Sequence, residues 1–166
     1  MLNRVPVSLD KILDASGKVL LVLPLVLILV QFSIVLMVYV FRSGSIQLQE
    51  SLQYINAIMF LAGAGYTALA DGHVRVDLFY SKFTEKQKAR VNFFGTLLLL
   101  LPFLILFFLT ALPYALESWA ILEASVETSG LPFVYILKTT LLLFPLTLAF
   151  HVVSTLIRTF QIMRTA

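Results

Sequence analysis

The residue types that could carry out chemistry are few in this chain, and they do not gather in the sequence. The 166 residues include no cysteine and only two histidines, His73 and His151. All nine acidic residues fall in loops or at the ends of apolar runs. A proton-coupled carrier is expected to hold a carboxylate within an apolar segment, and catalytic or metal sites need convergent reactive groups. The sequence therefore predicts no catalytic residues, no cofactor and no metal site.

Among the polar side chains within the apolar runs, three are candidates for binding or for contacts between helices. Gln31, Lys138 and His151 each stand among apolar neighbours. A buried glutamine can bind an ion or a substrate, but in lipid it more often hydrogen-bonds a neighbouring helix, as we also expect of His151. Lys138 lies about two turns into its run, so its side chain can extend outward to water or reach Glu127. These residues indicate helix contacts rather than a reactive site.

Four apolar runs must position these side chains. They cover about residues 19–41, 52–69, 93–116 and 131–157, and each is long enough to span roughly 30 Å of hydrocarbon. The runs are apolar nearly all round, as in helices that face lipid. The composition agrees, with 60% hydrophobic residues and a mean hydropathy of +0.96. We therefore predict an all-α membrane protein whose residues 1–166 form a single four-span domain in the lipid bilayer.

The basic residues indicate the orientation of these spans. Of the 12 Lys and Arg residues, all but Arg42 and Lys138 lie before residue 19, in the loop 71–92 or after residue 157. By the positive-inside rule, both termini and this loop face the cytoplasm. Within the loop, Thr84 and Gln87 have the spacing of a capping box, which predicts a helix leading into the third span. Nothing in the sequence indicates a nucleic-acid partner.

The opposite side carries most of its charge as glutamate. Glu50, Glu117, Glu123 and Glu127 all fall there. Acidic residues are tolerated on the outer side once the basic residues are placed inside, which is one explanation. The other is that they form a docking surface for an external partner.

The first residues have the pattern of an amphipathic helix. Apolar residues at helical spacing alternate with a polar face; the apolar set is Val5, Leu9, Ile12 and Leu13, and the polar set is Ser8, Asp10, Lys11 and Asp14. The pattern suits a short helix lying in the membrane interface, although a polar leader is an alternative. Since the first apolar run is long and lacks a small-x-small cleavage site, we expect it to be retained.

The second run carries the most small residues. Ala57, Ala64 and Ala68 fall near one face, next to the sequence Ala-Gly-Ala-Gly at 62–65. Small faces allow helices in lipid to approach closely. We expect this face to contact another helix, of this chain or of another subunit.

Several motifs resemble one known family. They are Glu50 at the start of the second span, Gly65-Tyr66 near its end, the loop sequence Asp-Gly-His-Val-Arg-Val-Asp-Leu at 71–78, and Ser125, Glu127 and Pro132 before the last span. This pattern is similar to the small membrane subunit, the DctQ-like family, of tripartite ATP-independent periplasmic (TRAP) transporters of bacteria and archaea. The resemblance extends from the second span to the fourth.

The resemblance implies a transport function shared with two other proteins. A periplasmic binding protein would deliver an organic acid, and a large multi-span subunit would move it inward with sodium. The large subunit would carry the substrate and sodium sites, so this chain would carry neither. We therefore expect a small permease subunit that scaffolds the large one in the cytoplasmic (inner) membrane of a bacterium or archaeon.

The resemblance also suggests roles for individual residues. Glu50 is expected in the first turn of the second span, where the helix dipole favours a carboxylate. The loop residues His73, Arg75 and Asp77 would hold the cytoplasmic loop against the membrane surface or the large subunit. Finally, three outer glutamates would border the surface offered to the binding protein: Glu117, Glu123 and Glu127.

Two other functions remain open at this point. The chain could be a free-standing small transporter, which would need to form homo-oligomers in order to enclose a path. It could also be the anchor or assembly subunit of a different membrane complex, such as a respiratory enzyme. The lack of a carboxylate within the spans counts against the first, and the poor support for a bis-histidine haem counts against the second.

Overall fold

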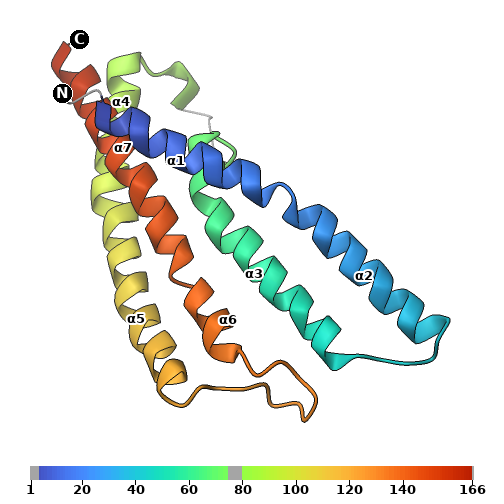
Figure 1. Ribbon diagram of the computed structural model, residues 1–166. Helices are drawn as coiled ribbons and strands as arrows, with labels where there is room; N and C mark the ends of the chain where they lie inside the picture. The colour runs from blue at the N-terminus through green and yellow to red at the C-terminus, as the bar shows by residue number, and fades with distance from the viewer. Residues whose placement is uncertain (1–3, 75–79, 166) are drawn as a thin grey trace.

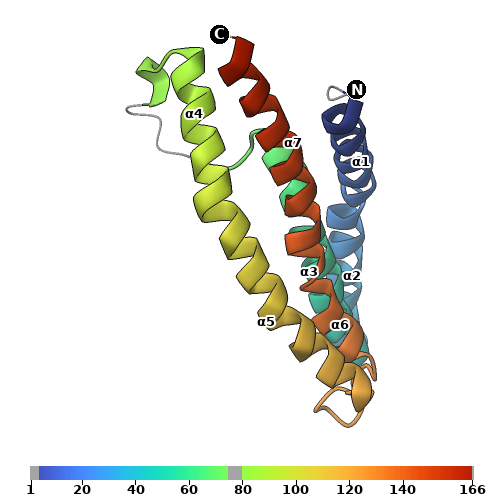
Figure 2. The same ribbon diagram turned by 90° about the vertical axis from the view of Figure 1, so that its left-hand side faces the viewer.

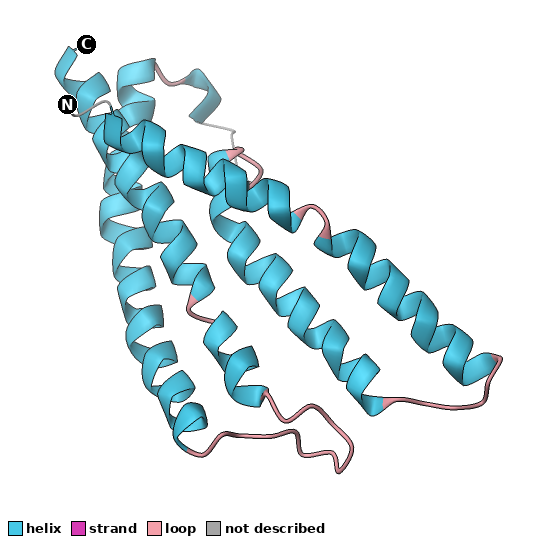
Figure 3. Cartoon of the chain, in the orientation of Figure 1, coloured by secondary structure: helices cyan, strands magenta, loops and turns pink. Residues whose placement is uncertain are grey.

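All the regular secondary structure of the described residues is helical. The computed structural model describes residues 4–74 and 80–165 (Figure 1). In chain order the elements are α1 (Arg4–Leu20), α2 (Leu23–Tyr39), α3 (Ile46–Leu69), η1 (Tyr80–Lys82), α4 (Glu85–Gly95), η2 (Thr96–Leu100), α5 (Leu101–Ala120), α6 (Val134–Thr140) and α7 (Leu143–Thr165). Figure 3 shows loops and turns as the remaining described structure. The predicted all-α fold is confirmed.

The long helices form an open layer. Figure 1 shows them side by side in the order α5, α7 with α6, α3 and α2, while α1 crosses α7 and α3. Contacts follow this order, since α2 packs on α3, α3 on α7, and α7 on α4 and α5. Figure 2 shows α4, η2 and α5 as one continuous rod. Each helix in such a layer leaves much of its surface to lipid or to a partner.

The two ends of the layer differ in charge. The N- and C-termini lie at the same end in Figure 1, together with the described parts of the loop between α3 and α4. We call this the basic end, because its residues include Lys82, Lys86, Lys88, Arg158 and Arg164. The loops 40–45 and 121–133 lie at the opposite end. We call that the acidic end, because it carries Glu50, Glu117, Glu123 and Glu127.

Three helical stretches of the described residues are long and apolar enough to cross a membrane. They are Val5–Tyr39, Glu85–Ala120 and Val134–Arg164. Each is longer than the predicted span, because flanking amphipathic turns continue the helix. α3, which holds the predicted second span, is not among the three, since glutamine, asparagine and small residues lower its hydropathy. The count of four spans stays a prediction.

α3 is nevertheless long enough to cross the hydrocarbon. Its 24 residues extend about 36 Å at 1.5 Å per residue. α2 packs along one side and α7 along another, and α1 crosses it near the basic end. A helix covered in this way can carry more polar and small residues than one surrounded by lipid.

The contact between α3 and α7 contains the main apolar core. Ala64 on α3 is buried in a cluster with Leu104, Leu148 and Val152, and Ala68 packs against this cluster. At Gly65 the backbones approach so closely that an added Cβ would lie 2.7 Å from the carbonyl oxygen of Thr147. The small face of α3 therefore packs on a helix of the same chain, while Ala57 is half-buried.

α1 is a helix, as predicted, but it uses a different face from the one expected. Leu13 is buried and a Cβ at Gly17 would overlap the ring of Tyr66, whereas Ile12 is 52% exposed. Asp10 lies on the packed side, where it accepts hydrogen bonds from the hydroxyl of Ser154, at 2.7 Å, and from Arg158. α1 is therefore docked on α7 and α3 by both apolar and charged contacts.

This docking leads to a prediction about Asp10. We expect Asp10→Ala to destabilise the protein by about 1 to 2 kcal/mol, because a largely buried carboxylate with two donors is removed. Faster hydrogen exchange in α1 would accompany the loss. The matched control is Asp14→Ala, since the Asp14 side chain is 47% exposed, against 13% for Asp10, and pairs along its own helix with Lys18. Equal effects of the two substitutions would contradict the docking role.

Candidate functional site: the acidic end and the basic-end pocket

The loop 121–133 at the acidic end is closed by its own hydrogen bonds. The backbone N–H of Ser125 donates to the carbonyl of Leu131 at 3.1 Å, and Gly130 donates to Glu127 at 2.9 Å. The hydroxyl of Ser125 accepts from the backbone N–H of Glu127 at 3.1 Å. These bonds bring the two ends of residues 125–131 together.

Glu50 fastens this loop to α3. Its Oε1 accepts a hydrogen bond from the hydroxyl of Ser125, and its Oε2 accepts from the backbone N–H of Leu131 at 2.6 Å. Because the Ser125 hydroxyl and then the Leu131 N–H stabilise the charged form, the pKa of Glu50 lies below its ordinary value. Gly130 allows the close approach, since a Cβ there would overlap Ser125 and Glu50.

The predicted place of Glu50 in the helix is wrong. α3 begins at Ile46, six residues before the predicted second span, so that its first turn contains no acidic residue. The N-cap is Ser45, whose hydroxyl accepts from the N–H of Leu48 at 3.3 Å. Glu50 lies one turn further along, where the effect of the helix dipole has declined. Its carboxylate is stabilised there by hydrogen bonds from the loop instead.

A second polar contact joins α6 to the same loop. The Nζ of Lys138 lies 2.5 Å from Oε2 of Glu123 and 4.1 Å from the centre of the Tyr114 ring. The contact lowers the pKa of Glu123, because the lysine donates to its carboxylate. Trp119 donates from Nε1 to Thr139 at 2.8 Å beside it. The structure thus gives Lys138 a carboxylate partner, but the partner is Glu123 and not the predicted Glu127.

The three outer glutamates therefore differ. Glu123 is only 30% exposed and holds Lys138, whereas the side chains of Glu117 and Glu127 are exposed. Among the three, only Glu117 and Glu127 are fully presented to an external molecule.

The ion pair supports a prediction about coupling. We expect Lys138→Met and Glu123→Gln each to lower the thermal unfolding temperature of the full chain, because each leaves a half-buried group without its partner. The double variant should lose less than the sum of the two, as a double-mutant cycle would measure. Glu127→Gln is the control for a surface carboxylate. Additive losses would show that the two groups act independently.

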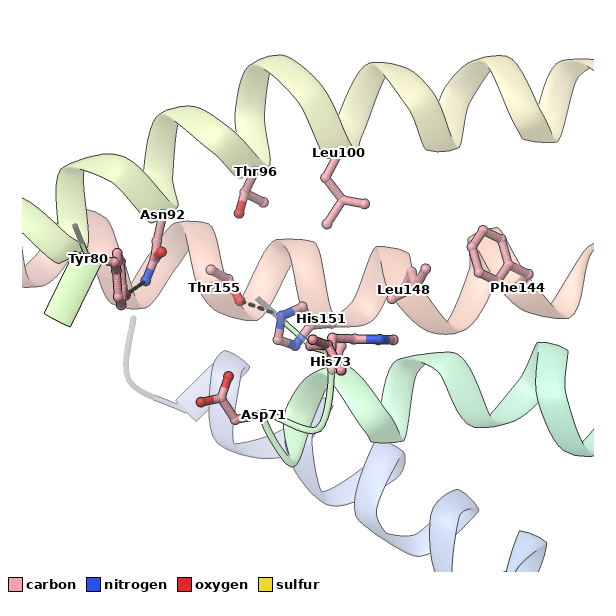
Figure 4. Close-up of a pocket in the computed structure, with 12 residues that line it drawn as sticks. Asp71, His73, Tyr80, Asn92, Thr96, Leu100, Phe144, Leu148, His151 and Thr155 are labelled. Carbon is pink, nitrogen blue, oxygen red and sulfur yellow. Dashed lines mark hydrogen bonds between the residues drawn. The ribbon is translucent and has the colours of Figure 1, made fainter. Parts of the chain in front are cut away.

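At the basic end, described residues of the loop between α3 and α4 line a pocket of about 750 Å³. Figure 4 shows His73 from this loop and His151 from α7 at the same pocket. The Nε2 of His73 lies 3.4 Å from the carbonyl oxygen of Ala64, and the Nε2 of His151 lies 3.2 Å from the hydroxyl of Thr155. Arg75 and Asp77 lie outside the described residues.

Other polar residues are placed as follows. The side chain of Gln31 is exposed on α2, and Asn92 donates to the Tyr80 hydroxyl at 2.8 Å. Among residues 4–74 and 80–165, no three His, Asp or Glu side chains come close enough together to hold a metal ion.

The structure joins residues that sequence reasoning left apart. Glu50, Ser125 and Glu127 all belong to the motifs quoted for the family resemblance, yet nothing in their spacing paired them. The contact of Asp10 with Ser154 and Arg158 was also missed. The available signal was a short polar residue, Ser154, one turn before Arg158 near the end of the last apolar run.

Comparisons with known proteins give the family. The family model for the DctQ component of tripartite ATP-independent periplasmic transporters matches residues 27–162. The match covers α3 to α6 and nearly all of α2 and α7, and it includes both the Glu50 contact and the basic-end pocket. No curated protein and no solved structure matches the chain. The chain therefore belongs to the DctQ family of TRAP transporter small membrane subunits.

Proposed function

We propose that this chain is the small permease subunit of a sodium-coupled TRAP transporter and scaffolds its large transport subunit. The observation that carries the proposal is the open layer of helices in a chain of the DctQ family. The large subunit, not this chain, would hold the substrate and sodium sites.

The open layer leaves an extended apolar surface exposed. Large apolar side chains are exposed along α2 and along the η2–α5 rod, including Leu25, Ile28, Leu29, Phe32, Leu98, Leu99, Leu106 and Leu109. In a bilayer these side chains face either lipid or a partner subunit. A flat layer can present one whole face to the large subunit while the opposite face stays in lipid.

The proposed orientation places the basic end in the cytoplasm. Four crossings, with α3 as the second, put both termini on one side, which agrees with their common position in Figure 1. The basic residues at this end then satisfy the positive-inside rule. The membrane is the cytoplasmic (inner) membrane of a bacterium or archaeon.

At the acidic end, the chain would contribute to the landing surface of the periplasmic binding protein that delivers an organic acid. Glu117 and Glu127 are exposed there, and Glu50 holds the loop between α5 and α6 in one conformation. A fixed loop costs less entropy to bind than a mobile one. At the basic end, His73, Arg75 and Asp77 would stabilise the complex with the large subunit.

The test is purification of the tagged full chain from its native host in mild detergent, followed by mass spectrometry and reconstituted uptake. We expect a stoichiometric multi-span subunit, and sodium-dependent uptake of an organic acid only when that subunit and a binding protein are both present. Arg75→Ala should reduce the yield of the complex or the uptake. Recovery of the chain only as a homo-oligomer that transports by itself would overturn the proposal.

A further inference from the structure

Two neighbouring hollows beside α3 share part of their lining. The basic-end pocket of about 750 Å³ is followed by a second hollow of about 550 Å³ beside α3. His73 and Phe144 line both hollows. We call the two together the seam groove. It extends from the basic end towards the middle of the layer.

The half of the seam groove at the basic end is rich in hydrogen-bonding groups. Its lining contains the side chains of Asn92, Thr96 and Thr155 together with the two histidines. Thr96 begins the π-helical turn η2, a local widening of the helix that is frequent at functional sites. Figure 4 shows these side chains coming from α4, η2, α7 and the α3–α4 loop. The carboxylate of Asp71 also lines this half.

The other half of the seam groove is almost entirely apolar. Met59, Phe60 and Leu61 line it, with Gly63 and Ala64 on the next turn. A Cβ added at Gly63 would meet nothing within 4 Å, so the space beside this residue is open. Phe60 is 68% exposed along this side of α3. The groove therefore changes from polar to apolar along its length.

We propose that the seam groove binds one phospholipid. The phosphate lies between His73 and His151 and accepts hydrogen bonds from the polar half, and one acyl chain lies past Phe144 beside Gly63. Charge-assisted hydrogen bonds to a phosphate are the strong ones.

Other occupants match only part of the groove. A free phosphate ion would leave the apolar half unused, although burial of an acyl chain there is favourable. An apolar helix of a partner protein would cover the polar half without supplying acceptors or donors, which is costly for buried polar groups. An amphiphile matches both halves at once, and this site does not depend on the transport role of the complex.

The test is native mass spectrometry of the purified full chain with palmitoyl-oleoyl phosphatidylethanolamine as the probe. We expect the natural chain to retain one lipid after detergent washing. Gly63→Phe fills the apolar half and should weaken retention by at least about tenfold, the effect of losing two buried CH₂ groups. Gly95→Phe is the matched control, because a Cβ at Gly95 also meets nothing within 4 Å and the residue does not line the groove.

A second arm tests the headgroup. Thr155→Val, which keeps the side-chain volume, should weaken retention while leaving the unfolding temperature nearly unchanged. Equal retention by the natural chain and Gly63→Phe would overturn the proposal. So would displacement of the lipid by inorganic phosphate alone, which would indicate a site for a free anion. If position 63 crosslinked to a partner protein in native membranes and no lipid were retained, the proposal would also be overturned. The groove would then be a contact site for that protein.

Discussion

Gly65→Ala is expected to destabilise the protein more than any other single methyl group added to α3. The new Cβ would lie 2.7 Å from the carbonyl oxygen and 2.8 Å from the carbonyl carbon of Thr147, and both are backbone atoms that no rotamer change can move. Overpacking of this kind costs about 1 to 3 kcal/mol. We expect a clear fall in the thermal unfolding midpoint of the full chain in detergent, because α3 and α7 must separate.

Gly63→Ala is the matched control for this prediction. It lies two residues away on the same helix, and its Cβ would meet nothing within 4 Å. Both substitutions raise helix propensity by up to about 1 kcal/mol relative to glycine. Gly63→Ala should therefore be neutral or stabilising. If Gly65→Ala behaved in the same way, the close packing of α3 on α7 would be disproved.

Glu50→Gln should release the loop 121–133 at the acidic end. The neutral amide is a weaker acceptor than the carboxylate, and only one of its two polar atoms can accept the hydrogen bonds now made by Ser125 and Leu131. Limited proteolysis within this loop should become several-fold faster, and exchange of the Leu131 amide should accelerate. Glu127→Gln is the control, because the side chain of Glu127 is exposed.

The same contact should respond to pH. The pKa of Glu50 in the folded protein is below that in the unfolded chain, so its contribution to stability is present above the unfolded pKa. It is lost as the pH falls through the lower, folded pKa. Protection of the loop should therefore be constant at neutral pH and decline in acid. In Glu50→Gln this decline of loop protection in acid should disappear. If the decline persisted in the variant, a group other than Glu50 would be responsible for it.

Several features followed from sequence patterns alone, because they depend on interactions local in the chain. Lipid as a solvent requires long apolar helices, and the composition alone indicates them. The capping box is another case, since the N–H of Thr84 donates to the Gln87 side chain at 2.9 Å and α4 begins at the next residue, as predicted. The ends of the helices in the first and last spans were less predictable. In the structure a single turn separates α1 from α2, and another separates α6 from α7.

The sequence by itself therefore determined the helical membrane fold and the family, since both depend on apolar run length and on short motifs. Only the tertiary structure decided which residues meet. Glu50 reaches a loop 75 or more residues away, and Asp10 reaches α7 across most of the chain. Such contacts depend on how the helices cross and on where a glycine such as Gly65 lets two backbones approach. Helical periodicity carries no information about the order of the helices in an open layer.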